Sequence, residues 1–297
     1  MSRPLWLVVV LVAVDFRAVA EDPVRPPFLE AVRPSAEARE ENPFEDRIET
    51  DRDAFTPTPR LIGVGRLGIE SAYSFVNNRG AKETHSLPEL LVRYGLTDRV
   101  ELRLGWSYEV GGESSTVSGS AGADDGLRPV ELEAGGLEEA LSLVRESTLT
   151  YGAKVRLNDQ AGWLPESSLI LVGQSKTSGP EKTTQVVATY VFGWELPNRW
   201  KLDAALRYAT AEEDGDHFHV WSPSTVIRVP VGERATVHAE YFGFFSRGRE
   251  ANSRKQFLSA GASYLLTPDL EVGVRGGPGL NDQSAFWFVN AGFGWRF

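Results

Sequence analysis

Cysteine is absent from the 297 residues of this sequence, and basic residues are outnumbered by acidic ones. Without a thiol, the chain forms no disulfide, offers no thiolate to a metal and carries no lipid anchor on an N-terminal cysteine. Lys and Arg number 31 against 41 Asp and Glu, which gives a net charge of −10 and no local basic cluster. Such a balance argues against a nucleic-acid partner.

The sequence motifs of common enzymes and cofactor sites are also missing. Neither G-x-S-x-G nor H-E-x-x-H occurs, and the glycine-rich residues 276–279 lack the helix and lysine of a phosphate-binding loop. His217 and His219 lie beside acidic residues, but a solvated loop explains them better than a metal site. A hydrolase assembled from separate strands stays open, with His85 and His238 as candidates, although no spacing selects them. We therefore predict no metal, no cofactor and no enzymatic activity.

The N-terminus has the three parts of a secretory signal. Arg3 supplies the positive charge, Leu5 to Val14 the apolar core, and Ala18 to Ala20 a cleavage site of the A-x-A type. Asp15 interrupts the apolar run, which is shorter than the roughly 20 residues of a membrane-spanning helix. We expect residues 1–20 to be a signal peptide and the mature protein to leave the cytoplasm.

Residues 21–60 differ from the rest of the chain because they carry seven prolines among many charged residues. They show no strand alternation, and such a composition cannot bury enough apolar surface to fold alone. Two interpretations stay open. The segment is either an acidic, disordered periplasmic extension or a partial plug, for which Asp51, Arg52 and Phe55 are the candidate residues.

From residue 61 to the end, apolar and polar residues alternate with period two, most clearly in Val100 to Val110. The alternating segments are separated by short turns and by longer, more polar loops, as in outer-membrane barrels. An even count of about twelve strands returns both chain ends to the periplasm. We therefore expect residues 61–297 to form an all-β, transmembrane, antiparallel up-and-down β-barrel behind the Pro-rich N-terminal extension. The expected strands are 65–75, 87–96, 100–110, 147–157, 167–175, 184–196, 200–210, 217–229, 235–245, 256–266, 270–276 and 285–297.

The last thirteen residues, Ala285 to Phe297, contain six aromatic residues and alternate to the very end. In a soluble sheet this strand would be an exposed, aggregation-prone edge. In a closed membrane barrel it is an ordinary closing strand with an aromatic face toward lipid. Its end also resembles the signal that the outer-membrane assembly machinery recognises, with Trp295 and Phe297 as the candidate residues.

Charged residues of both signs share the face of the strands opposite the apolar one. An Arg or Lys that faces lipid at mid-depth costs roughly 2 to 4 kcal/mol, so a barrel must place these residues inside. They either pair across strands and fill a narrow lumen or line a hydrated path for small solutes. The mixture of signs argues against a strongly ion-selective filter. The lumen-facing candidates are Glu70, Arg93, Glu101, Arg103, Lys154, Arg156, Asp203, Arg207, Glu240, Glu271, Arg275 and Arg296.

Several stretches resemble the outer-membrane barrel family labelled as a putative MetA pathway of phenol degradation. They are Glu49 to Arg52 with Thr56-Pro57, Gly65 to Leu67, Leu87 to Gly105, Glu240 to Gly243, Leu270 to Val274 and Leu280 to Phe297. The resemblance implies an outer-membrane barrel that transports small aromatic or apolar compounds. The long loop 111–146, with a helical pattern at Leu137 to Leu141, departs from the family's compact pattern.

Together these features predict a passive outer-membrane channel. Its expected partners are outer-membrane lipid, the assembly machinery and a small-molecule solute. One rival interpretation is a closed-lumen barrel with a structural or surface-interaction role, in which the loop 111–146 makes the contacts. The second rival is an outer-membrane hydrolase. Flux of solute through the barrel separates the first two, and hydrolysis of lipid or peptide would be needed to support the third.

Overall fold

The computed structural model describes residues 44, 46–79, 81–111, 117, 144–179, 184–213, 216–248 and 252–297. The predicted signal peptide, the first part of the Pro-rich extension and most of the loop 111–146, including its helical pattern, lie outside the described residues. Among those described, no helix is long and apolar enough to cross a membrane.

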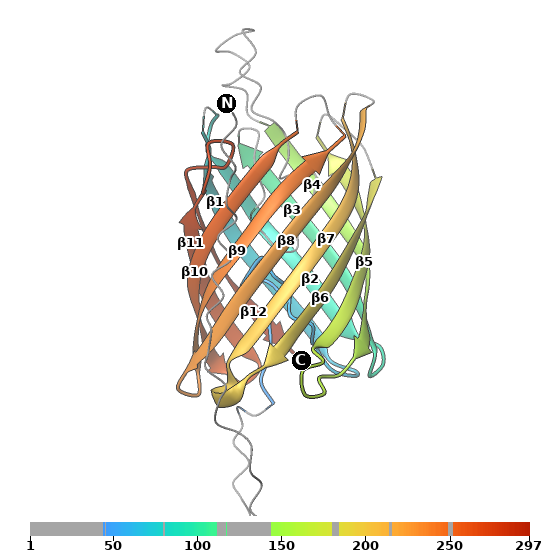
Figure 1. Ribbon diagram of the computed structural model, residues 1–297, viewed down its shortest axis with the longest axis vertical. Coiled ribbons are helices and arrows are strands. Elements are labelled where there is room, and N and C mark those ends of the chain that lie inside the picture. The colour runs from blue at the N-terminus through green and yellow to red at the C-terminus, as the bar shows by residue number, and fades with distance from the viewer. Residues whose placement is uncertain are drawn as a thin grey trace, which may run out of the picture. The chain divides into compact units, whose positions relative to one another are not determined.

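The strands form one closed antiparallel barrel in which each strand pairs with its neighbours in the chain and β12 pairs with β1 (Figure 1). The predicted all-β, up-and-down barrel is therefore confirmed. Its strands are β1 (Leu67–Asn77), β2 (Thr84–Gly95), β3 (Val100–Gly111), β4 (Val144–Asn158), β5 (Glu166–Ser178), β6 (Thr184–Glu195), β7 (Lys201–Glu213), β8 (Asp216–Val231), β9 (Ala235–Arg247), β10 (Arg254–Thr267), β11 (Leu270–Pro278) and β12 (Trp287–Arg296).

The seam between β1 and β12 closes the barrel without a free edge. Its register runs from Gly68 opposite Arg296 to Asn77 opposite Trp287. Beyond the last strand residue, the Phe297 amide donates to the Leu67 carbonyl at 2.8 Å. Because every strand has two partners, the aromatic C-terminal strand offers no edge for aggregation.

The connections differ between the two ends of the barrel. Short turns join β2 to β3, β8 to β9 and β10 to β11, and a 3₁₀ turn at Pro197–Arg199 joins β6 to β7. The chain ends at this same end of the barrel (Figure 1). In outer-membrane barrels the short turns face the periplasm. We therefore refer to it as the periplasmic end.

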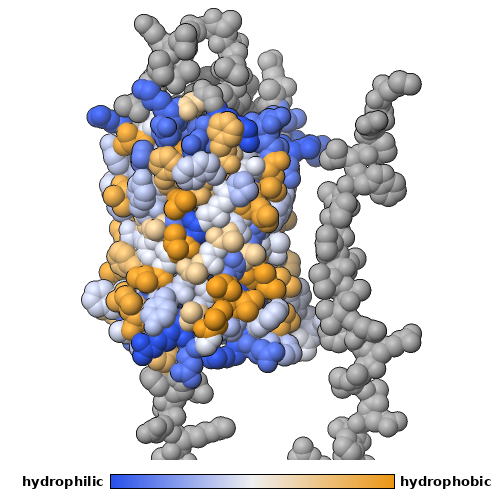
Figure 2. Space-filling model, turned by 90° about the vertical axis from the view of Figure 1, so that its left-hand side faces the viewer, coloured by the Kyte–Doolittle hydropathy of each residue, from blue (hydrophilic) through white to orange (hydrophobic). Residues whose placement is uncertain are grey.

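The outer wall of the barrel is apolar and the inner wall is charged. On β3, Leu102, Leu104 and Trp106 are exposed, while the intervening Glu101 and Arg103 are buried. Figure 2 shows hydrophilic residues gathered at the two ends of the barrel and hydrophobic ones on the wall between them. A wall with this pattern is stable in a bilayer and would aggregate in water. The barrel is thus built for an outer membrane.

Residues 46–60, called the N-terminal segment below, lie inside the barrel, and they contain no strand. Ile48, Ala54, Phe55 and Thr56 are each at most 2% exposed. The segment thus supplies much of what the barrel wall packs against. It meets buried side chains of strands from around the whole barrel, so the core of this protein is the filled barrel interior.

Candidate functional site

The N-terminal segment is anchored at Asp51 by three cations of the barrel wall. Asp51 Oδ2 lies 2.6 Å from Arg103, 3.1 Å from Lys154 and 3.9 Å from Arg93. The carboxylate also accepts the Thr58 amide at 2.9 Å, which folds the segment back on itself. The three cations come from β2, β3 and β4, so a single carboxylate joins three neighbouring strands to the segment.

Two glutamates of the wall complete this charged cluster. Arg93 donates to Glu101 at 2.9 and 3.0 Å and to Glu70 at 2.8 Å. Glu70 in turn accepts the backbone amides of Asp51 and Arg52, at 2.9 and 3.1 Å. Arg93, Glu70 and Glu101 are 0% exposed, so solvent does not reach the wall at this level. Every ion here is held by opposite charges or by backbone donors, as buried ions require.

The aspartates of the N-terminal segment remain ionised in this environment. Burial alone raises the pKa of Asp51, but Arg93, Lys154 and Arg103 outweigh that effect and hold the pKa well below its usual range. Burial also raises the pKa of Asp53, and Arg228 reverses the shift in the same way. Both carboxylates are therefore negative near neutral pH and attract the cations of the wall.

Arg228 on β8 holds the opposite side of the segment. Its guanidinium pairs with both oxygens of Asp53, at 2.9 and 3.0 Å, and reaches Asp203 of β7 at 2.6 Å. It also donates to the Thr56 carbonyl at 3.1 Å. Arg228 is not among the residues predicted to face the lumen, because the alternation in the expected strand 217–229 does not settle which face of that strand points inward.

Glu240 on β9 binds the middle of the segment through backbone groups. It accepts the amides of Phe55 and Thr56, at 3.0 and 2.6 Å, and the Thr56 hydroxyl at 2.8 Å. Arg275 of β11 supports the carboxylate at 3.3 Å. The hydrogen bonds from the Phe55 and Thr56 amides to Glu240 fix the backbone here and thereby the position of the Phe55 side chain.

Phenylalanine side chains form a buried cluster around Phe55. Its ring stacks on Phe242 with centroids 4.5 Å apart and meets the edge of Phe244 at 5.2 Å. Phe242 stacks in turn on Phe257 at 5.0 Å, and the edge of Phe288 is 5.8 Å away. These inward-facing wall aromatics were not predicted. For Phe242 and Phe244, the even spacing from Glu240 along β9 was the available signal, since residues two apart share a face.

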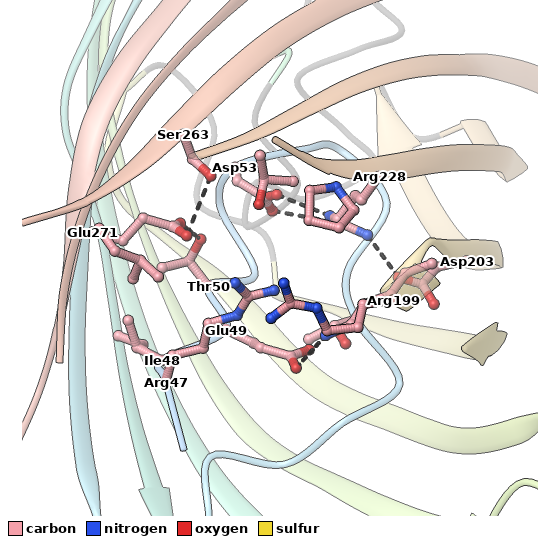
Figure 3. Close-up of a pocket in the computed structure, with 15 residues that line it drawn as sticks. Arg47, Ile48, Glu49, Thr50, Asp53, Arg199, Asp203, Arg228, Ser263 and Glu271 are labelled. Carbon is pink, nitrogen blue, oxygen red and sulfur yellow. Dashed lines mark hydrogen bonds and ion pairs between the residues drawn. The ribbon is translucent and has the colours of Figure 1, made fainter. Parts of the chain in front are cut away.

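A cavity of about 40 Å³ lies between the N-terminal segment and the strands β7 to β11. Figure 3 shows carboxylates and guanidinium groups converging on it from both the segment and the wall. Thr50 donates to Glu271 at 2.7 Å, and Ser263 donates to the other oxygen of that carboxylate at 3.2 Å. The pocket is small, and most of the side chains that line it are polar or charged. The lining residues labelled in Figure 3 are Arg47, Ile48, Glu49, Thr50, Asp53, Arg199, Asp203, Arg228, Ser263 and Glu271.

The candidate residues from the sequence fall into three places. Arg156 and Arg296 lie at the periplasmic end, where they pair with residues such as Asp159 and Asp269. Arg52 donates to Asn290 inside the barrel at 3.0 Å. Trp295 and Phe297 are exposed on the outer wall with their rings 4.5 Å apart. The remaining wall candidates lie inside the barrel, namely Glu70, Arg93, Glu101, Arg103, Lys154, Asp203, Arg207, Glu240, Glu271 and Arg275.

The histidines do not form a site together. His85 and His219 are exposed and each contacts a tyrosine hydroxyl at 2.7 Å, whereas His238 is buried inside the barrel. Within the described part of the chain, no group of three or more His, Asp or Glu side chains is arranged to hold a metal ion.

Residues 50–297 match the protein family described as "Putative MetA-pathway of phenol degradation". The chain belongs to this family. The match begins within the N-terminal segment and extends to the C-terminal Phe297, so it spans both the barrel and most of the segment inside it. No curated protein matches the sequence.

Among solved structures, an outer membrane channel of Pseudomonas putida F1 has a similar fold. It shares 14% identity and a TM-score of 0.54, over 84% of this chain and all of the other. The NanC porin shares 9% identity and a TM-score of 0.47, over 78% of this chain and all of the porin. The translocator domain of the autotransporter NalP from Neisseria meningitidis shares 13% identity and a TM-score of 0.49, over 79% of this chain and 89% of that domain.

Proposed function

We propose that this protein is an outer-membrane channel for the passive passage of small solutes, and that the N-terminal segment is its plug. The observation that carries the proposal is the composition of the barrel interior. The closed strand ladder does not include the segment, and side chains such as Glu70 and Glu240 bind it. The segment can therefore withdraw while the barrel keeps its backbone hydrogen bonds.

Withdrawal of the plug would leave a polar path through the barrel. Arg93 would stay paired with Glu70 and Glu101 on the wall, and Arg103 with Glu101. Together with Lys154, these mixed charges would favour no single ion. Transport would follow the concentration gradient, because the sequence carries no nucleotide-binding motif. The buried phenylalanine cluster supports small aromatic or apolar compounds as the solutes.

Delivery to the membrane would use the two ends of the chain. Residues 1–20 would direct export, and the C-terminal strand would be recognised during barrel assembly. Phe297 suits the second role because its side chain is exposed while its backbone closes the seam with Leu67.

A closed structural barrel is the second candidate function, and the filled interior favours it. A hydrolase is less consistent with the geometry, because His85 lies on the outer wall and His238 on the inner wall. These two side chains cannot serve one catalytic centre.

Swelling of liposomes that contain the folded protein tests the proposal. We expect slow swelling with small neutral solutes for the full-length mature chain and faster swelling for the double variant Asp51→Asn, Asp53→Asn, because both anchors of the plug are lost. Rates should fall as the solute size increases. If neither protein causes swelling above that of empty liposomes, the barrel is closed and structural. Hydrolysis of lipid or peptide by the purified barrel would instead support the hydrolase function.

A further inference from the structure

The ring of Phe55 occupies a place that is built for an aromatic ring yet is not part of the barrel wall. Phe242 stacks on the ring with an interplanar angle of 12°, and Phe244 meets its edge at 80°. The guanidinium of Arg207 lies over the same ring, 4.6 Å from its centroid. Stacking, edge and cation–π contacts all select a flat, electron-rich ring over an aliphatic group of similar size.

Polar groups of the wall adjoin this ring site and are unused. In the residues that the structure describes, the hydroxyls of Ser222 and Ser224 are buried and have no hydrogen-bond partner. Ser222 is the register partner of Arg207, and Ser224 is the register partner of Phe242. Directly opposed residues on one face of a sheet lie about 5 Å apart at Cβ, so these serines lie next to Arg207 and Phe242, the two side chains that contact the faces of the Phe55 ring. A buried hydroxyl without a partner is costly, and a polar ligand would remove that cost.

The charge around the site favours a neutral ligand. Arg207 is cationic, and the buried carboxylate of Glu240 binds the Phe55 amide at 3.0 Å and pairs with the cation Arg275 at 3.3 Å, so charges of both signs surround the site. An anionic ligand would meet this carboxylate in a poorly solvated place. A hydroxyl substituent instead enriches the ring in electrons and can bond to Ser222 or Ser224.

We propose that the position of the Phe55 ring is a binding site for a neutral, single-ring aromatic solute that carries a hydroxyl group, and that this solute and Phe55 exclude each other. The proposal rests on the channel function proposed above and deepens it. In the plugged protein, the Phe55 side chain fills the site that the solute would otherwise fill. A solute that takes its place removes the stacking contact that helps to hold the plug, so solute binding and plug release are coupled.

The test uses the full mature chain in lipid nanodiscs, with phenol as the probe and cyclohexanol as the non-aromatic match. Binding is measured by calorimetry for the wild type, Phe55→Ala and Phe288→Ala. The last variant is the matched control, because it opens a cavity in the same cluster while Phe55 remains in place. Phe55→Ala should bind phenol about tenfold or more tightly than the wild type, because a competing side chain lowers the apparent affinity.

Three results would overturn the proposal. One is an unchanged phenol affinity in Phe55→Ala. The others are an equal gain for cyclohexanol or an equal gain in Phe288→Ala, either of which would identify a nonspecific cavity. A third variant keeps the test valid if Phe55→Ala folds poorly. Since the chain has no Cys, Ala54→Cys introduces a single buried thiol in the plug. Phenol should speed the labelling of that thiol several-fold, and cyclohexanol should not; equal rates with both would contradict the coupling.

These binding measurements are independent of flux. Phenol binding without liposome swelling in any variant would support the proposed ring site and contradict the proposed channel function. Swelling without selective phenol binding would support the channel function and contradict the ring site.

Discussion

At the scale of single residues, Asp51 is the group on which the inner charge network depends most. Three buried cations face it, and its own backbone amide is bound by Glu70. Removal of one partner from a buried ionic network leaves the others uncompensated, which is far more costly than the loss of a surface pair.

We therefore expect Asp51→Asn to weaken docking of the N-terminal segment by about 3 to 5 kcal/mol. The measurement is the labelling rate of a cysteine at Ala54, which should rise roughly 100-fold or more. Asp159→Asn is the matched control, because its pair with Arg156 is exposed and contributes at most about 1 kcal/mol. Similar labelling rates in the two variants would show that Asp51 does not anchor the segment.

The side of the wall on which most charged residues lie could be predicted from the sequence, but their partners could not. Alternation with period two placed Arg93, Glu101 and Arg103 together because a strand has only two faces. Asp51, the common partner of Arg93 and Arg103, lies about 40 to 50 residues earlier, in a segment without a repeating pattern, and only the folded chain brings it there. Phe242 was overlooked because aromatic residues in barrels were expected to face lipid.

At the scale of the elements, each strand separates lipid on one face from the charged interior on the other. On β3, Leu104 is about half exposed near the middle of the strand. Leu96, which is equally exposed, lies in the short turn before that strand. The two leucines therefore differ in depth but little in accessibility.

Leu104→Arg should lower the free energy of unfolding in lipid by roughly 2 to 4 kcal/mol, because the charge lies near mid-bilayer. Leu96→Arg should lower it by only about 0 to 1 kcal/mol, because its charge reaches the interface. Urea titration of the protein in vesicles measures both values. A cost for Leu96→Arg as large as that for Leu104→Arg would place the membrane boundary elsewhere.

At the end of the closing strand β12, the backbone contributes to the fold, while an exposed aromatic side chain is available for recognition during assembly. The backbone of Phe297 pairs with Leu67, whereas its ring lies outside and contacts Trp295. Removal of the ring leaves the hydrogen bonds of the seam unchanged.

Phe297→Ala should therefore reduce the amount of barrel assembled in cells several-fold while refolding of the purified chain into vesicles stays normal. Trp200→Ala is the control, because Trp200 is also an exposed aromatic at the periplasmic end. The two yields are compared by heat-modifiable gel mobility. A defect in refolding as well as in cells would mean that the ring acts in the fold and is not an assembly signal.

At the scale of the whole molecule, the protein is a barrel whose interior is completed by its own N-terminal segment. The barrel could be predicted because alternation, turn lengths and the aromatic C-terminus all indicated the same architecture. The sequence left open whether the segment enters the barrel, since its prolines and charges suit a disordered tail equally well. Its hydrogen bonds and ion pairs come from strands throughout the barrel, and none of these contacts leaves a local trace in the sequence.

Single-channel conductance in planar bilayers shows whether the barrel conducts and whether the N-terminal segment plugs it. The mature wild type is compared with a variant that lacks residues 21–60, at the same salt and voltage. We expect rare, brief openings for the wild type and a steady conductance for the shortened protein, because the charged wall remains while the plug is gone. A shortened protein that folds and inserts but carries no current would contradict the channel and its plug together.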